Sequence, residues 1–233
     1  MQFEPLPSES AYNEAHVPIP FLNSTEGNAW FFESRLPMYF DVGYDNPDRV
    51  RMEVGWATEL SIHLMAHETP VLNIGRYHAI TGRPLVPPFW SFAPHYWRNE
   101  TSGQNEVLDD LEKIRANDIP AGVFWIDRPW QANYNDFVFD PERYDAPQDM
   151  IDEMNGLGFE LVLWSAPYTS EDSDAWQECS EENYFYEGPK LFTKFGIMMD
   201  LTNPDAMSLW QDLIGRTVKM GARGFKLDYG EDV

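Results

Sequence analysis

Cysteine, positive charge and long apolar segments are scarce in this 233-residue sequence, and each shortage excludes a class of protein. Cys179 is the single cysteine, so an intrachain disulfide and a cluster of thiolate metal ligands are both excluded. Only 16 lysines and arginines stand against 39 aspartates and glutamates, which gives a formal net charge of -23. Such a surface repels polyanions, so we expect neither nucleic acid nor an anionic membrane as a partner.

Targeting segments and cofactor motifs are also missing. Residues 1–20 have no basic start and no apolar run, so no secretory signal is visible and a cytoplasmic location is expected. No apolar stretch approaches the roughly 20 residues of a membrane-spanning helix. There is no phosphate-binding or dinucleotide-binding glycine motif, and Leu64 stands where a zinc-protease helix needs glutamate between His63 and His67. We therefore expect no metal and no cofactor.

Aromatic and apolar residues are plentiful, and their pattern divides the chain into two domains. Hydrophobic residues make up 43% of the sequence and aromatic residues 15%, which is enough for a substantial core. Residues 28–66 contain short apolar or alternating runs separated by Gly, Pro, Asn and Asp, a pattern typical of antiparallel β-structure. The proline-rich segment 84–88 enforces an extended path. We place the boundary there, between domains at 1–83 and 84–233.

The second domain alternates strands with amphipathic helices, as does a parallel sheet with crossover helices. The last predicted helix has Asn203 as its N-cap, Pro204 at its first position and Gly221 at its end. Four strands are predicted, at Phe89–Ala93, Gly122–Ile126, Glu160–Trp164 and Gly224–Asp228.

Charged and aromatic side chains gather at the carboxyl ends of these strands. Alternation places Lys226 and Asp228 on one face of the fourth predicted strand, and Trp125 and Asp127 on one face of the second. Aromatic planes bordered by carboxylates suit sugars, because pyranose CH groups stack on rings and hydroxyls donate to carboxylates. Each residue taken alone also fits a core filler or a structural ion pair. Their joint placement at strand ends favours a carbohydrate ligand.

Several motifs occur in the order in which glycoside hydrolase family 31 has them. Residues 224–231, with the sequence GFKLDYGE, resemble its nucleophile segment, and residues 201–206 resemble the segment before its fourth barrel strand. Residues 77–90 resemble its passage from β-sandwich to barrel. The resemblance implies an α/β fold: the first half of a (β/α)8 TIM barrel, with four strands in 84–233, preceded by part of an antiparallel β-sandwich.

This resemblance implies a retaining α-glycosidase that hydrolyses terminal α-linked sugars through a covalent glycosyl-enzyme on Asp228. Lys226 and the spacing from Asp127 to Trp130 look more like the α-xylosidase branch than the α-glucosidase branch, so the expected substrate is an α-xyloside or an α-glucoside. The residues expected around the sugar are Asp127, Trp130, Trp164, Lys226 and Glu231.

Two other functions remain open at this point. A lyase of the same family would form the same intermediate and then eliminate, whereas a non-catalytic carbohydrate-binding protein would keep the aromatic rim without turnover. In the family the general acid follows the nucleophile strand, and after Asp228 only Glu231 and Asp232 carry carboxyl groups. We therefore expect the general acid to lie outside this chain, and the 233-residue chain alone to be inactive.

Overall fold

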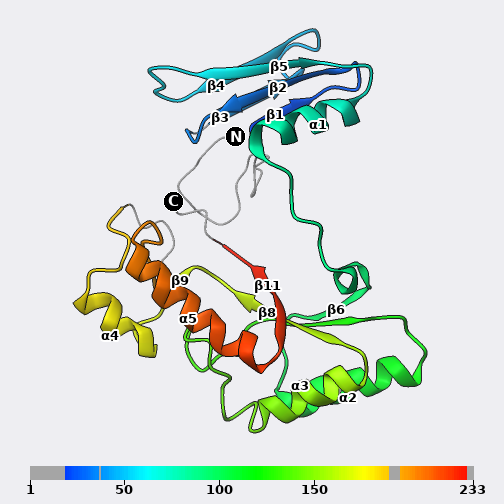
Figure 1. Cartoon of the computed structure of the whole chain (residues 1–233), viewed down its shortest axis with the longest axis vertical. Coiled ribbons are helices and arrows are strands. Elements are labelled where there is room, and N and C mark those ends of the chain that lie inside the picture. Colours follow the sequence, from blue (N-terminus) through cyan, green and yellow to red (C-terminus); the bar gives the residue numbers. More distant parts are fainter. Residues whose placement is uncertain (1–18, 37, 189–194, 230–233) are drawn as a thin grey trace. The chain divides into compact units, whose positions relative to one another are not determined.

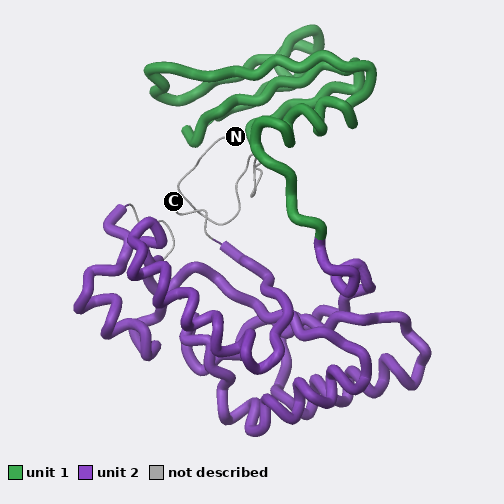
Figure 2. Tube along the Cα trace, viewed as in Figure 1, with its two compact units in different colours: residues 1–86 green, residues 87–233 purple. Residues whose placement is uncertain are grey.

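The computed structural model describes residues 19–36, 38–188 and 195–229. The chain divides into two compact units, Met1–Val86 and Pro87–Val233, which are described separately below (Figure 2). No helix within the described residues is long and apolar enough to cross a lipid bilayer.

The described residues of unit 1 form two antiparallel sheets and one helix (Figure 1). Phe31, Ala29 and Met65 are buried between the larger sheet and the helix, where Tyr77 packs edge-on against Phe31. The elements are β1 (Phe21–Asn23), β2 (Asn28–Glu33) and β5 (Ser61–Ala66) in one sheet, β3 (Met38–Val42) and β4 (Val50–Val54) in the other, and α1 (Pro70–Thr81). The antiparallel β-structure predicted for this part of the chain is confirmed, whereas α1 was not anticipated.

Unit 2 is built on a parallel sheet of four strands in the spatial order β11-β8-β7-β6 (Figure 1). The strands of this sheet are adjacent in the order in which they occur along the chain, and helices connect them. This is the arrangement at the start of a (β/α)8 barrel. The predicted fold class is confirmed. The strands are β6 (His95–Arg98), β7 (Val123–Ile126), β8 (Glu160–Ser165) and β11 (Ala222–Leu227); the helices are α2 (Gln104–Ala116), α3 (Pro147–Gly156), α4 (Asp174–Glu181) and α5 (Pro204–Met220).

The first barrel strand begins later than predicted. A 3-10 helix, η1 (Phe89–Phe92), occupies the segment assigned to that strand, and β6 begins only at His95. Local hydrogen bonds explain the difference: the backbone N–H and the hydroxyl of Ser91 both donate to the carbonyl of Pro88, so donors that a strand would use in a ladder are satisfied within the turn. The apolar run at 89–92 is therefore largely exposed.

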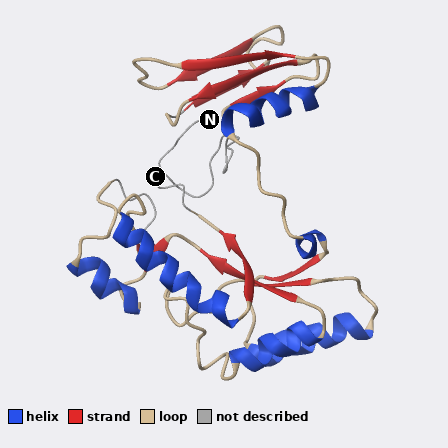
Figure 3. Ribbon diagram, in the orientation of Figure 1, coloured by secondary structure: helices blue, strands red, loops and turns tan. Residues whose placement is uncertain are grey.

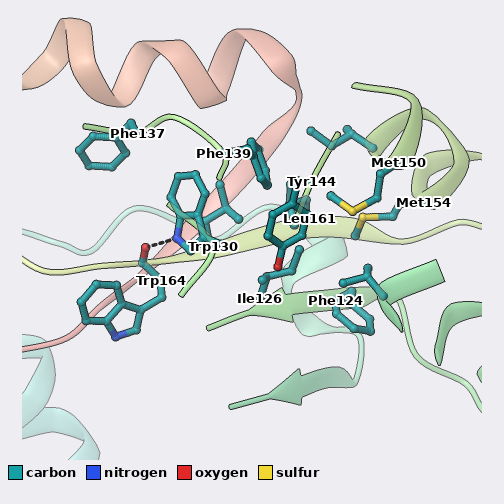
Figure 4. Close-up of a cluster of buried hydrophobic side chains, with 14 of the residues drawn as sticks. Phe124, Ile126, Trp130, Phe137, Phe139, Tyr144, Met150, Met154, Leu161 and Trp164 are labelled. Atoms are coloured by element: carbon teal, nitrogen blue, oxygen red, sulfur yellow. Dashed lines mark hydrogen bonds between the residues drawn. The ribbon is translucent and has the colours of Figure 1, made fainter. Parts of the chain in front are cut away.

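The helices cover one face of the parallel sheet, and a different set of strand side chains lies on the opposite face. Helices α2 and α3 lie together against that face (Figure 3). Figure 4 shows part of the resulting core, in which Phe124, Ile126 and Leu161 from the strands meet Met150 and Met154 from α3. Because side chains alternate along a strand, residues between these core positions point away from the helices.

A short β-ribbon and α4 fill the long connection between β8 and α5. The ribbon pairs β9 (Tyr168–Thr169) with β10 (Ile197–Met198) in an antiparallel manner. Helix α5 then begins as predicted: the Asn203 side chain accepts a hydrogen bond from the Asp205 backbone at 2.9 Å, and Pro204 is the first helical residue. Gly221 ends the helix with a φ of 122°, a conformation that favours glycine.

Candidate active site

Two carboxylates stand one residue beyond the carboxyl ends of two strands that flank β8 in the parallel sheet, and one ammonium group joins them. Asp127 follows β7 and Asp228 follows β11. The Nζ of Lys226 lies 3.0 Å from Asp127 Oδ2 and 3.3 Å from Asp228 Oδ2. The Asp127 side chain is 3% exposed and the Asp228 side chain 37%. The two acids thus differ sharply in their access to solvent.

Two indole groups extend this hydrogen-bonded chain to the remaining strands. Trp97 of β6 donates from Nε1 to Asp127 Oδ2 at 2.8 Å, and Trp164 of β8 donates from Nε1 to Asp228 Oδ2 at 2.9 Å. The backbone N–H of Arg128 donates to Asp127 Oδ1 at 2.9 Å. All four strands of the parallel sheet therefore contribute to one network.

Strand register explains why these side chains meet. Trp97 pairs with Trp125 across β6 and β7, and Trp164 pairs with Lys226 across β8 and β11. Paired residues in a parallel sheet point to the same face, here the face opposite the helix-covered core. Asp228 lies two residues after Lys226 and so returns to that face, as the sequence predicts.

The electrostatic environment keeps Lys226 charged. Burial lowers the pKa of Lys226, but hydrogen bonds and charge from Asp127 and then from Asp228 outweigh this effect, so the net pKa is raised above its ordinary value. The faces of Trp97 and Trp125 lie 5.7 and 5.6 Å from the ammonium nitrogen and add a cation–π attraction. A positive charge therefore stands between the two carboxylates at neutral pH.

Trp130, which was predicted beside the sugar, lies in the core of the described structure. Trp130 is 0% exposed, and its Nε1 donates to the backbone carbonyl of Trp164 at 2.8 Å (Figure 4). The segment after Trp130 folds back through a bridge between Gln131 and Phe139, which turns the indole inward against the Phe139 ring. Its contact with Trp164 gives it an indirect role, since Trp164 in turn holds Asp228.

Of the other predicted site residues, three lie together, one is buried beside them and one lies outside the described residues. Asp127, Lys226 and Asp228 come together in one network. Trp164 is buried, with its ring against Phe195 and only its N–H directed at Asp228. Glu231 lies outside the described residues.

Trp97 was not predicted among the residues around the sugar. Its strand was predicted at 89–93, so the alternation that identifies Trp125 and Asp127 was not applied to it. A strand at 95–98 would have placed Trp97 on the same face as Trp125.

Side chains that could bind a metal are dispersed in the described part of the chain. Within the described ranges, no group of three or more His, Cys, Asp or Glu side chains is arranged to hold a metal ion. His63, whose spacing from His67 suggested a metal pair, instead lies on β5 with its Nε2 3.1 Å from Glu33 Oε2.

The second part of the chain matches a known protein family. A model of the glycosyl hydrolases family 31 TIM-barrel domain matches residues 84–233. The chain belongs to family 31. This match begins within the proline-rich segment and includes every strand of the parallel sheet.

Curated relatives in family 31 include α-xylosidases and α-glucosidases. Alpha-xylosidase XylQ of Lactiplantibacillus pentosus is 27% identical over 97% of this chain and 30% of its own length. An alpha-glucosidase of Saccharolobus solfataricus is 24% identical over 93% of this chain and 32% of its own length. The chain thus spans about 30% of the length of each of these two relatives.

Solved structures support the fold. A family 31 dextranase of Flavobacterium johnsoniae, complexed with glucose, superposes with a TM-score of 0.83 at 22% identity, covering 96% of this chain and 29% of that one. A family 31 α-xylosidase from a soil metagenome, complexed with xylose, gives a TM-score of 0.71 at 19% identity, covering 91% of this chain and 32% of that one. At these identities the likeness establishes the architecture alone.

Proposed function

We propose that this chain carries the nucleophile half of a retaining α-glycosidase, with Asp228 as the nucleophile. The observation that carries the proposal is the position of Asp228 at the carboxyl end of the fourth barrel strand, where barrel enzymes hold their chemistry. Its carboxylate is accessible, and Trp164 and Lys226 fix its orientation through Oδ2. Family membership supplies the class of reaction.

In this mechanism a carboxylate oxygen of Asp228 attacks the anomeric carbon as the bond to the leaving oxygen breaks. A second carboxyl group protonates the leaving oxygen, and water then hydrolyses the covalent glycosyl-enzyme. Both described contacts to Asp228 involve Oδ2, so we assign the attack to Oδ1. The ammonium of Lys226 stabilises the negative charge of the waiting nucleophile.

The remaining residues divide into ligands and supports. Asp127 and Lys226 are the groups we assign to sugar hydroxyls, together with Glu231. Trp164 borders the subsite and orients Asp228, and Trp130 supports Trp164 from the core side. We place α-xylosides before α-glucosides as substrates, because Lys226 follows the α-xylosidase pattern and two of the curated relatives are α-xylosidases.

The test requires a protein with a complete barrel that contains these residues. It should hydrolyse aryl α-xylosides or aryl α-glucosides with retained anomeric configuration, observed by NMR during early turnover. Asp228→Asn should remove turnover while circular dichroism remains unchanged, since the change removes the attacking oxygen at nearly constant volume. An inverted first product, or near-normal turnover by the variant, contradicts the mechanism. An unsaturated sugar product would instead indicate elimination.

A further inference from the structure

We propose that Trp97 is a positioning residue that fixes the Asp127 carboxylate for sugar binding, an inference that rests on the proposed function. Its indole N–H donates to Asp127 Oδ2 at 2.8 Å from the neighbouring strand. A tryptophan that served only to fill the core would be buried, but Trp97 is 50% exposed. Its polar atom is nevertheless used on a carboxylate that is 3% exposed.

The indole of Trp97 occupies one of the hydrogen-bond acceptor positions of the Asp127 carboxylate. A carboxylate offers about four lone-pair directions. Within the described residues, Oδ2 accepts from Trp97 and Lys226, and Oδ1 accepts from the Arg128 backbone. Oδ2 is thus saturated, and one position on Oδ1 remains for a hydroxyl donor. Trp97 therefore determines which oxygen of Asp127 faces the substrate.

The indole also restrains rotation of the carboxylate. Lys226 alone would hold Oδ2 through a flexible side chain that is shared with Asp228. The donor from Trp97 comes from a rigid ring on β6, which lies beside Trp125 with 6.5 Å between ring centroids. Two donors from different strands define the plane of the carboxylate, and such preorganisation is what a hydrogen-bonding subsite requires.

A double-mutant cycle in the active, complete-barrel protein tests this role. Trp97→Phe keeps an aromatic ring but removes the donor, and we expect kcat/KM for the aryl glycoside to fall on the order of tenfold, the effect of losing a hydrogen bond to a charged group. In an Asp127→Ala background the same change should alter kcat/KM by less than about twofold, because its target is gone. An equal loss in both backgrounds would show that Trp97 does not act through Asp127.

A matched control separates loss of the donor from loss of an indole in general. Trp176 of α4 is a partly exposed indole that packs against Phe185, with 4.6 Å between ring centroids and 48° between the ring planes. Trp176→Phe should leave kcat/KM within about twofold of the unmodified protein. A comparable loss in this control would attribute the Trp97 effect to general destabilisation and overturn the proposal.

A spectroscopic arm in the complete-barrel protein decides the contact independently of turnover. In indole ¹⁵N–¹H spectra, the resonance that Trp97→Phe removes should shift clearly upfield in Asp127→Asn, because the charged acceptor is replaced by a neutral one. A resonance unmoved by Asp127→Asn would refute the hydrogen bond and the proposal with it. Absence of turnover in the unmodified complete-barrel protein would instead count against the proposed function, and the indole spectrum would still decide the contact.

Discussion

At the scale of single residues, Lys226 holds the greatest share of the site's electrostatics, because it is bonded to both carboxylates. Replacing it with methionine leaves Asp127 buried without its counter-ion. We expect Lys226→Met to lower the free energy of unfolding at pH 7 by about 1–3 kcal/mol. Urea titration followed by tryptophan fluorescence measures this change, and most of the tryptophans lie in unit 2.

The pH dependence of that difference has a defined sign. Since the folded pKa of Lys226 is raised, its contribution is fully present below the unfolded value of about 10.5 and is lost as the pH rises through the folded pKa. The stability gap between the unmodified chain and Lys226→Met should therefore be constant at neutral pH and shrink in strongly alkaline buffer. A gap that widens with alkaline pH would mean that the ammonium is not stabilised by its neighbours.

Trp130 provides a second test at this scale, because its indole is buried in the core. Trp130→Phe removes the donor to the buried Trp164 carbonyl and leaves a void beside Phe139. We expect a loss of about 2–4 kcal/mol in the free energy of unfolding. Trp56→Phe is the control, because Trp56 is 96% exposed and should change stability by less than about 0.5 kcal/mol. Similar effects from both would contradict the core assignment.

Sequence alternation was sufficient for some site residues and insufficient for others. It brought Lys226 and Asp228 to one face because both lie on one strand with a period of two. It failed for Trp130, whose direction depends on the bridge between Gln131 and Phe139, a contact across a loop that no local pattern records. The face on which Trp97 lies was not predicted, because its strand was placed six residues too early.

At the scale of elements, the start of α5 shows how a side chain sets a boundary that can be measured. Asn203→Ala removes the acceptor of the Asp205 N–H and should lower the free energy of unfolding by about 1 kcal/mol. Asn203→Asp keeps an acceptor at a helix N-terminus, where negative charge is favourable, and should change stability little. Equal losses in both variants would show that the cap does not stabilise the helix.

Elements with caps and regular periodicity were predictable, whereas two elements governed by prolines were not. The helices at α2, α3 and α5 carry their apolar residues at helical spacing. Helix α1 was overlooked, although Thr69 followed by Pro70 is a helix-start signal, because only the segment after Tyr77 was interpreted. At η1 the prolines favour a tight turn over a strand, which apolar content alone does not reveal.

At the scale of the whole molecule, the described sheet has four parallel strands where a complete (β/α)8 barrel has eight. Within the described residues, β11 pairs only with β8, so its other edge presents unpaired backbone groups. Leu227 on this strand is 80% exposed. Such an edge favours pairing with another chain.

We therefore predict that the 233-residue chain alone self-associates and has no glycosidase activity. A retaining enzyme needs a second carboxyl group about 5 Å from the nucleophile to act as an acid. Asp127 does not fit this role, because its carboxylate already accepts hydrogen bonds from Trp97, Lys226 and the Arg128 backbone. Aryl α-glycoside assays combined with size-exclusion chromatography over a range of concentrations measure both properties.

Two variants distinguish pairing at the β11 edge from non-specific association through exposed apolar side chains. Leu227→Lys should shift the elution toward the monomer, because a charge on an edge strand opposes pairing. Val71→Lys is the control: Val71 is 73% exposed, but it lies on helix α1, which has no strand edge to offer. If both variants disperse the chain equally, exposed apolar surface in general, and not the β11 edge, causes the association. A monodisperse monomer with turnover that Asp228→Asn abolishes would overturn the prediction entirely, because catalysis would then need neither a further strand nor an acid from outside this chain.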